Sequence, residues 1–348
     1  MEREADTRVV PLPDDPNDPA WQAVVDDIRQ LLGQGRLVAV PTETVYGLAG
    51  RGLDEDVVRS IYQAKGRPAD NPVILHVCSL EDAWPLWDVD DVARARIERL
   101  AAAFWPGPLT MVATASDVVP PVTRAGLPKV AVRVPGHPFA RALARALQEP
   151  FAAPSANLSG RPSPTTAEHV LETLRGRIAA VVDGGACSAG LESSVVDVSG
   201  ERPRLLRPGA LAVLALKRVL PDLEVRGPGQ AAHLDDASPG IRHRHYAPAL
   251  HSVRLVAPAE LSTLWPTTTG LILREVEAQE LLRRLGPRAA FVAALPDDED
   301  GYGRALYAAL YRAERAGLSS LAIAAVPDAV PDADRWLAVR DRLARATT

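Results

Sequence analysis

Two short segments in the first quarter of the sequence carry side chains that can bind small charged ligands. Pro41-Thr-Glu-Thr-Val-Tyr-Gly47 places hydroxyl groups and a carboxylate directly after an apolar run. Lys65-Gly-Arg-Pro-Ala-Asp-Asn-Pro72 places two cations in a loop that two prolines hold in a fixed shape. A rigid pair of cations is a good clamp for phosphate. The alternatives are that Thr42 and Thr44 cap a turn, and that the cations only complement a helix dipole.

Later segments pose the same choice between a structural role and ligand binding. Arg133 and Arg207 lie within or at the end of apolar runs, so each charge must meet a protein carboxylate or an anionic ligand. Ser155 and Asn157 follow another apolar run, where they could bind a ligand or cap a turn. The glycine-rich stretch 184–194 could wrap phosphate with backbone N–H groups or simply reverse the chain.

Several familiar catalytic motifs are missing from the sequence. It contains no GxxxxGK[ST], so a P-loop does not hold any nucleotide. It contains no HExxH, GxSxG or EF-hand loop, and its histidines show no metal-ligand spacing. Open α/β sheets bind their ligands at the carboxyl ends of strands. We therefore expect the polar segments to meet at strand ends.

Apolar periodicity predicts an α/β domain with a mixed sheet over residues 21–220. We expect strands at 37–40, 73–77, 109–113, 130–134, 151–153, 179–182, 195–198 and 204–206. We expect helices at 21–33, 54–66, 91–104, 138–148 and 167–174. The helix that starts at Asp54 should end at Gly66.

The rest of the chain divides by composition. Residues 1–20 are polar and proline-rich and are predicted to be an extended N-terminal extension. Residues 221–249 have the composition of a linker. Residues 250–348 alternate between strand and helix patterns, which predicts a small parallel-sheet domain. This part has no GxGxxG turn, so we do not interpret it as a dinucleotide site.

Composition excludes some classes of protein. Of the 348 residues, 47% are hydrophobic and 24% charged, as in ordinary globular proteins, and no run is long enough to span a membrane. The net charge of −5 argues against nonspecific binding of nucleic acid. Cys78 and Cys187 are expected to be buried thiols, and no signal-peptide core follows the charged start, so we predict a cytoplasmic protein.

The motifs taken together resemble one family. PTETVYGL, KGRPADNP, FWPGPLT, VAVRVPGHP, APSANLSGRPSPT, ESSVVD and LLRPGA follow one another across residues 37–213. This series resembles the catalytic domain of the Sua5/YrdC/YwlC family of threonylcarbamoyl-AMP synthases. The linker and second domain resemble the long Sua5 form. The resemblance implies a YrdC-like domain with a twisted mixed sheet flanked by helices, and a smaller Rossmann-like α/β Sua5 domain.

The resemblance also implies a reaction. L-threonine, bicarbonate (or CO2) and ATP give threonylcarbamoyl-AMP and pyrophosphate, for N6-threonylcarbamoyladenosine at adenosine 37 of tRNA. It implies Mg2+ with the ATP, no protein metal site, and a downstream tRNA threonylcarbamoyl transferase complex that makes direct tRNA binding unnecessary. Rival interpretations are an RNA-binding module and a carbamoyltransferase.

The resemblance assigns roles by position. Lys65 and Arg67 are implied to be catalytic. The implied contacts of threonine are Thr44, His76, Arg133, Ala153 and Ser193. The implied contacts of ATP are Arg67, Asn71, Lys129, Ser155, Ser163, Arg207 and Tyr246, the last in a linker that acts as a lid. The chain departs from the family at His243, where we expect a tyrosine.

Overall fold

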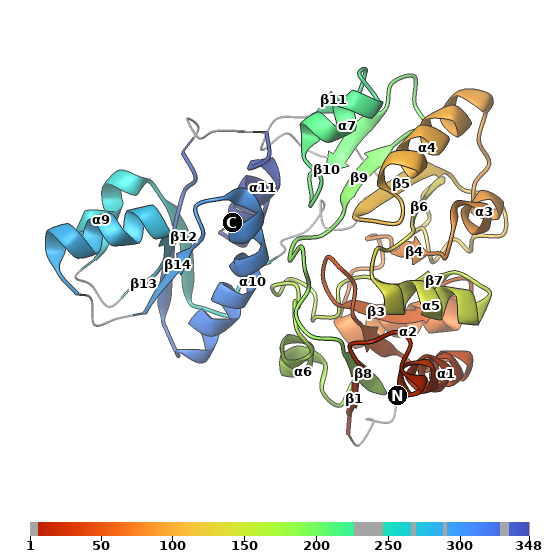
Figure 1. Ribbon diagram of the computed structural model, residues 1–348, viewed down its shortest axis with the longest axis horizontal. Helices are drawn as coiled ribbons and strands as arrows, with labels where there is room; N and C mark the ends of the chain where they lie inside the picture. The colour runs from red at the N-terminus through yellow and green to blue at the C-terminus, as the bar shows by residue number, and fades with distance from the viewer. Residues whose placement is uncertain (1–5, 226–245, 266–268, 288–290, 328–333, 348) are drawn as a thin grey trace.

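Two α/β units, one large and one small, lie side by side in the computed structural model (Figure 1). The structure describes residues 6–225, 246–265, 269–287, 291–327 and 334–347. The large unit is built on an 11-stranded mixed sheet and the small one on a 4-stranded sheet. Both units therefore have the predicted α/β architecture.

The strands of the large sheet come from distant parts of the sequence. In spatial order they are β1 (Arg8–Pro11), β8 (Ala180–Asp183), β2 (Val38–Val40), β3 (Gly47–Arg51), β7 (Phe151–Ala152), β4 (Ile74–His76), β6 (Lys129–Arg133), β5 (Leu109–Thr114), β9 (Ser194–Asp197), β10 (Arg204–Arg207) and β11 (Glu224–Val225). The pairs β4–β6 and β5–β9 are parallel, whereas β3–β7, β4–β7 and β5–β6 are antiparallel. This mixture confirms the predicted mixed sheet.

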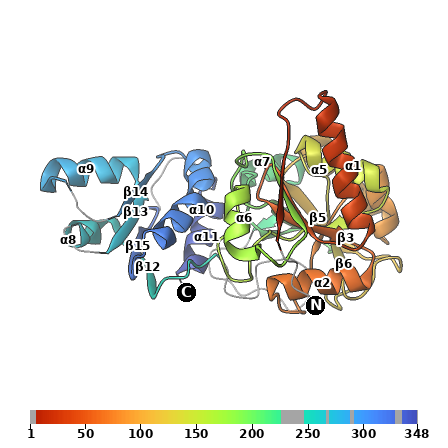
Figure 2. The same cartoon turned by 90° about the horizontal axis from the view of Figure 1, so that it is seen from below.

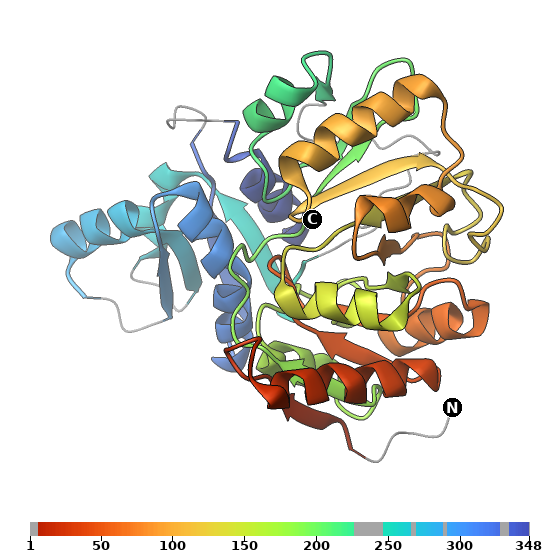
Figure 3. The same ribbon diagram turned by 45° about the vertical axis from the view of Figure 1, so that its right-hand side comes forward.

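Helices cover both faces of the large sheet. They are α1 (Pro19–Gly33), α2 (Glu55–Lys65), α3 (Leu80–Ala83), α4 (Asp91–Phe104), α5 (Pro138–Leu147), α6 (Ala167–Leu174) and α7 (Val213–Val219), with a 3-10 turn at Trp84–Leu86. Helices α1 and α5 pack side by side on one face, and α2 lies on the other (Figures 2 and 3). No helix in the described ranges is long and apolar enough to cross a membrane.

Local sequence determines the ends of α2, the helix that carries the first cation. The Asp54 side chain accepts hydrogen bonds from the backbone N–H groups of Asp56 and Val57, satisfying donors at the helix start. Gly66 ends the helix in the left-handed conformation, with φ 58°. Both predicted ends are confirmed, and the polar loop after Gly66 is thereby fixed in direction.

Three strands of the large sheet, β1, β3 and β11, are not among the predicted ones. The predicted extension 1–20 contributes β1, which pairs in parallel with β8 at the sheet edge, and α1 already begins at Pro19. Strand β3 was not predicted because its glycines and alanine give no strand pattern. A Cβ on Gly50 would lie 2.8 Å from Val57 Cγ1 and 3.0 Å from Ile61 Cδ1. Glycine there lets α2 pack directly on the sheet.

The small unit confirms the predicted parallel sheet. Its strands run in the order β12 (Ser252–Val256), β15 (Ser320–Ala324), β13 (Gly270–Arg274) and β14 (Val292–Leu295), all parallel. Its helices are α8 (Leu261–Leu264), which follows a 3-10 turn at Pro258–Glu260, α9 (Glu275–Leu285), α10 (Glu299–Arg315) and α11 (Leu337–Ala346). Helices α10 and α11 lie on the side that faces the large unit (Figures 1 and 2).

The predicted linker lies mostly outside the described residues, and with it His243. At its N-terminal end, β11 pairs in parallel with β10. At its C-terminal end, Tyr246 is buried at 4% exposure. The described ends of the segment 221–249 are therefore part of the folded protein.

Candidate functional site

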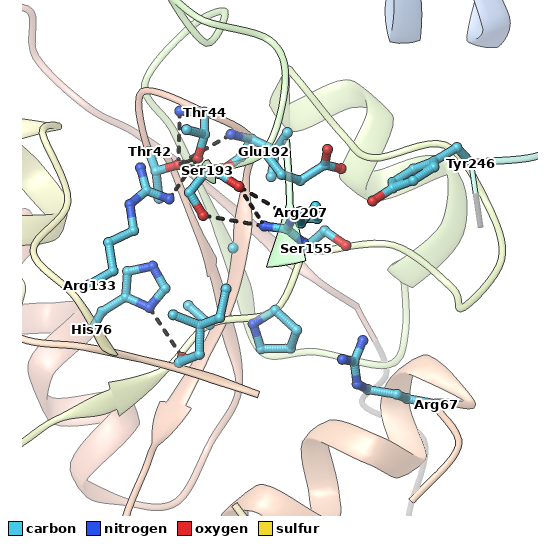
Figure 4. A pocket seen from close by; sticks show the side chains of 15 residues that line it. Thr42, Thr44, Arg67, His76, Arg133, Ser155, Glu192, Ser193, Arg207 and Tyr246 are labelled. Carbon is cyan, nitrogen blue, oxygen red and sulfur yellow. Dashed lines mark hydrogen bonds between the residues drawn. The ribbon is translucent and has the colours of Figure 1, made fainter. Parts of the chain in front are cut away.

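The predicted site residues meet at one pocket where several strands of the large sheet begin or end. The pocket opens between the segment after β2, the ends of β4, β6 and β10, and the residues that flank β7 and β9. Nine residues predicted from the sequence line it: Thr44, Arg67, His76, Arg133, Ala153, Ser155, Ser193, Arg207 and Tyr246. Figure 4 shows Arg133 and His76 at one end and Arg67 at the other. We call these the Arg133 end and the Arg67 end.

At the Arg133 end, the guanidinium of Arg133 has partners on three sides. Its Nη2 lies 2.6 Å from Glu43 Oε1, its Nη1 donates to Thr44 Oγ1 at 2.9 Å, and its Nε donates to Gly107 O at 3.1 Å. Glu43 also accepts from the backbone N–H of Gly136 at 2.8 Å. Arg133 thus makes the internal salt bridge that was one of the two alternatives, and it also lines the pocket, so its binding of an anionic ligand stays a prediction.

The two threonine hydroxyl groups near Arg133 have different roles: that of Thr42 caps a turn, and that of Thr44 contacts Arg133. Thr42 Oγ1 donates to Val45 O at 2.6 Å and accepts from the N–H groups of Thr44 and Val45, so it caps the turn after β2. Thr44 Oγ1 accepts from Arg133 instead and lies in the pocket. The turn orients Thr44 toward the site.

His76 is a neutral side chain at this end of the pocket. Its ring stacks on Phe151 with centroids 5.3 Å apart, and Nδ1 lies 3.3 Å from Ile74 O. Burial and the nearby charge of Arg133 lower the pKa of His76 to about 3. Since imidazole stays uncharged at neutral pH, it can accept a hydrogen bond from a polar ligand without adding positive charge.

At the Arg67 end, two buried guanidinium groups are held by oxygen atoms of neutral groups. Arg67 donates to Asn71 O at 2.9 Å, to Asn71 Oδ1 at 2.7 Å and to Pro72 O at 2.7 Å. Arg207 donates from Nη2 to Ser193 O at 3.0 Å and to Ser193 Oγ at 3.3 Å. Burial, with a further contribution from Arg207, lowers the pKa of Arg67 to about 10. This end therefore favours a ligand with several negative charges.

Three predicted residues lie one contact behind the pocket wall. Lys65 Nζ donates to Ser155 O and, at 2.7 Å, to Asn157 O. Asn71 holds Arg67, and Ser163 Oγ donates to Glu192 Oε1 at 2.6 Å. In this arrangement they fix the side chains and backbone that line the pocket.

Lys129 is not among the residues that line this pocket, and its expected contact with ATP stays a prediction. Its Nζ lies 2.8 Å from Asp197 Oδ2, a carboxylate that also binds Arg204 at 2.8 Å. Lys129 and Arg133 are at opposite ends of β6, and only Arg133 lies at the pocket. The cation of Lys129 thus has a structural partner within the sheet.

Sequence reasoning missed Glu192, which lines the pocket between Ser193 and Tyr246. It is buried, and its carboxylate binds Ser163 and two side chains of the small unit. Burial alone raises the pKa of Glu192, but Arg342 and Arg207 outweigh it and lower that pKa to about 2. A signal existed, since a glutamate precedes Ser193-Ser194 in an otherwise apolar stretch. Its partners could not be read from the sequence.

Tyr246 lies opposite Glu192 in a strained backbone conformation. Its φ is 68°, in the left-handed region that a bulky residue rarely adopts. The phenol points into the pocket toward Glu192 (Figure 4). Strain of this kind costs on the order of 1–3 kcal/mol and persists where the surroundings hold it. The surroundings here are the small unit, since the Tyr246 ring lies 5.6 Å from that of Tyr307.

We expect Glu192 to make the free energy of unfolding fall as the pH is lowered. Its pKa is about 2 in the fold against an ordinary 4.5, so its ion pair stabilises the protein above about pH 4.5. That contribution, on the order of 3 kcal/mol, is lost as the pH falls from 4.5 toward 2. Glutamine does not titrate, so Glu192→Gln should lose less stability than the parent protein as the pH falls. In denaturant titrations, the free energies of unfolding of Glu192→Gln and of the parent protein should therefore converge between pH 5 and pH 3. Equal acid sensitivity of the two would contradict this assignment.

The fold and the site define a two-domain α/β protein with an arginine-lined pocket at strand ends, near the junction of the domains. Residues 30–209 match the Sua5/YciO/YrdC family model, described as "Telomere recombination", and residues 212–348 match "Threonylcarbamoyl-AMP synthase, C-terminal domain". The chain belongs to the Sua5/YrdC family.

Similar proteins support this membership along nearly the whole chain. The threonylcarbamoyl-AMP synthase of Pyrococcus abyssi is 39% identical over 319 residues, 90% of this chain and 91% of its own length. That of Bacillus subtilis is 44% identical over 219 residues, 63% of this chain and 62% of its own length. A crystal structure of P. abyssi Sua5 complexed with L-threonine matches at a TM-score of 0.86 and 35% identity, over 98% of both chains.

Proposed function

We propose that this chain is an L-threonylcarbamoyladenylate synthase. It joins L-threonine, bicarbonate or CO2, and ATP into threonylcarbamoyl-AMP and pyrophosphate. The observation that carries this proposal is the meeting of two unlike ends in one pocket. One end holds a hydroxyl, a neutral imidazole and an arginine, and the other holds two buried cations.

The Arg133 end is assigned to threonine. Arg133 binds the amino acid carboxylate, and Thr44, His76, Ser193 and the backbone at Ala153 surround the rest. All of these residues line the pocket. The related P. abyssi protein was crystallised with L-threonine, which supports the assignment.

The Arg67 end is assigned to ATP. Arg67, Ser155 and Arg207 contact its phosphates, Asn71 and Ser163 support them, and Tyr246 covers the bound nucleotide. Among the described residues, no group of three or more His, Cys, Asp or Glu side chains could hold a metal ion. In our proposal, Mg2+ arrives bound to the phosphates of ATP and counts as part of that substrate.

The proposed reaction balances without a protein nucleophile. The threonine amine, freed of its proton, takes up CO2 and loses a proton, or takes up bicarbonate and loses water, and becomes a carbamate. A carbamate oxygen then forms a bond to the α-phosphorus of ATP, and the bond from that phosphorus to the β-phosphate oxygen breaks. Positioning and charge neutralisation supply most of the catalysis. Arg67, which lines the pocket, is the cation we assign to the reacting phosphate, and Lys65 acts on the same group through the backbone of Ser155, to which it donates.

In this proposal, the threonylcarbamoyl group of the product is later transferred to tRNA. A separate tRNA threonylcarbamoyl transferase complex places the threonylcarbamoyl group on adenosine 37, so the synthase itself need not bind tRNA. The free thiols of Cys78 and Cys187 suit a reducing compartment, and we assign the protein to the cytoplasm.

Pyrophosphate release tests the proposal directly. Purified protein with Mg2+ and ATP should release pyrophosphate only when threonine and bicarbonate are both present. Leaving out either one should reduce release to background, because no carbamate forms. Release that is indifferent to both omissions would contradict the proposal, and consumption of carbamoyl phosphate without threonine would favour a carbamoyltransferase.

A further inference from the structure

The small unit reaches the pocket through one carboxylate. Glu192 Oε2 accepts from Arg342 Nε of α11 at 2.8 Å, and both carboxylate oxygens lie within 3.1 Å of the Tyr307 hydroxyl of α10. From the large unit, Ser163 donates to Oε1 at 2.6 Å. Two of these three donors therefore come from the C-terminal domain.

The same two side chains also hold Tyr246. The Arg342 guanidinium carbon lies 5.2 Å from the centroid of the Tyr246 ring, and the Tyr307 ring lies 5.6 Å away. Arg342 has no exposed surface, and its Nη1 is fixed by Asp341 at 2.6 Å. Tyr246 and Glu192 both line the pocket, so the C-terminal domain supports two adjacent parts of its wall.

We propose that Arg342 and Tyr307 are positioning residues for the nucleotide end of the site. They hold the Glu192 carboxylate, and with it Ser163, together with the ring of Tyr246, in the arrangement that receives ATP. The C-terminal domain thus completes the ATP site without touching the reacting atoms. This inference rests on the proposed function for the identity of the nucleotide.

The need to dock the two domains does not by itself explain the contacts that Arg342 and Tyr307 make with Glu192. The two units are also joined by Arg161 with Glu314, by Arg315 with Glu172, and by the Tyr311 hydroxyl on Pro162 O. These contacts lie away from the pocket wall. A buried ion pair stabilises a fold no more than well-packed apolar side chains of similar volume would, because desolvation of both charges offsets their attraction. Its place beside the pocket is better explained by a role in the site.

Three buried tyrosines on α10 provide a matched test. Tyr307 binds Glu192, Tyr311 binds Pro162 O across the same domain boundary, and the Tyr302 hydroxyl, also buried, has no hydrogen-bond partner among the described residues. Each is changed to phenylalanine in the full chain. Measured are the Kd for MgATP without threonine, the KM values for ATP and threonine, kcat, and Tm.

Tyr307→Phe should raise the Kd and KM for ATP about three- to tenfold, less than the tenfold or greater loss of a direct hydrogen bond to a charged group, because Tyr307 acts through Glu192. The KM for threonine should change by less than about twofold. Tyr311→Phe and Tyr302→Phe should bind ATP as the parent protein does, even if Tm falls. Arg342→Met should weaken ATP binding more than Tyr307→Phe, and adding Glu192→Gln to it should recover part of the loss.

The outcomes separate this inference from the proposed function. If the parent protein turns over and Tyr307→Phe and Arg342→Met bind ATP normally, the inference is overturned. Equal ATP weakening in Tyr307→Phe and Tyr311→Phe also overturns it, since general docking would then be the cause. If the parent protein binds ATP but needs no threonine, the proposed function fails while the Tyr307 result still tests the positioning role. A parent protein that does not bind ATP overturns both.

Discussion

Replacement of Arg133 by methionine should lower kcat/KM for threonine by at least about 100-fold, because a buried, charge-assisted contact to the substrate carboxylate is lost. The same change removes the partner of Glu43, which lies 2.6 Å from Arg133. Breaking a buried ion pair by removing one member costs about 3–5 kcal/mol of stability. Pyrophosphate release and denaturant unfolding together measure both effects.

A paired substitution separates the two effects of losing Arg133. Burial by itself raises the pKa of Glu43, and the charge of Arg133 lowers it below its ordinary value. Without Arg133, the carboxyl therefore tends to take up a proton. Arg133→Met with Glu43→Gln should recover much of the stability and none of the turnover. If the double variant regains threonine-dependent release, Arg133 does not bind threonine.

Lys65→Ala and Arg67→Ala should each reduce kcat by about 100- to 1000-fold, the usual effect of removing one group that stabilises charge in a transition state. Neither change should unfold the protein. Burial and the charge of Arg67 disfavour the ammonium form of Lys65 and hold its pKa well below the ordinary value. Pyrophosphate release under saturating substrates measures the rate, and circular dichroism checks the fold.

Lys217→Ala is the matched control for Lys65→Ala. The sequence has three lysines, and Lys217 lies exposed in the last turn of α7 and is not among the residues that line the pocket. Its rate should equal that of the parent protein. Near-normal turnover in Lys65→Ala would show that Lys65 only supports Ser155, as its hydrogen bonds in the free protein allow.

Features that depend on nearby residues could be predicted from the sequence. Asp54 and Gly66 determine the ends of α2 through contacts within three residues, so their types alone indicate the helix. The expectation that polar residues gather at strand ends also led to Arg133, Ser155 and Arg207. Strand β3 could not be predicted, because its Gly50 is required by the close packing of α2 on the sheet, and no pattern of neighbouring residues indicates that packing.

The supporting contacts of the site required the structure. Arg342 and Glu192 are 150 positions apart, and nothing around either residue indicates the other. Lys129 shows the opposite case. The resemblance to the family assigned it to ATP, whereas its ammonium binds Asp197, at the end of β6 opposite to Arg133. Whether a side chain is buried, which charge it pairs with and at which end of a strand it lies relative to the site follow from the three-dimensional structure and not from the neighbouring sequence.

The order of strands in the large sheet has a consequence for how the protein is made. Strand β2 pairs with β8 at Val38↔Ala180, and β3 pairs with β7 at Gly50↔Ala152. On a ribosome, the early strands must therefore wait for more than a hundred further residues before their neighbours emerge. Until then the apolar edge of β2 has no partner on that side, and such edges invite pairing with other chains. We expect nascent chains that end before β8 to aggregate or to engage chaperones, and chains that extend past it to cover this edge of β2.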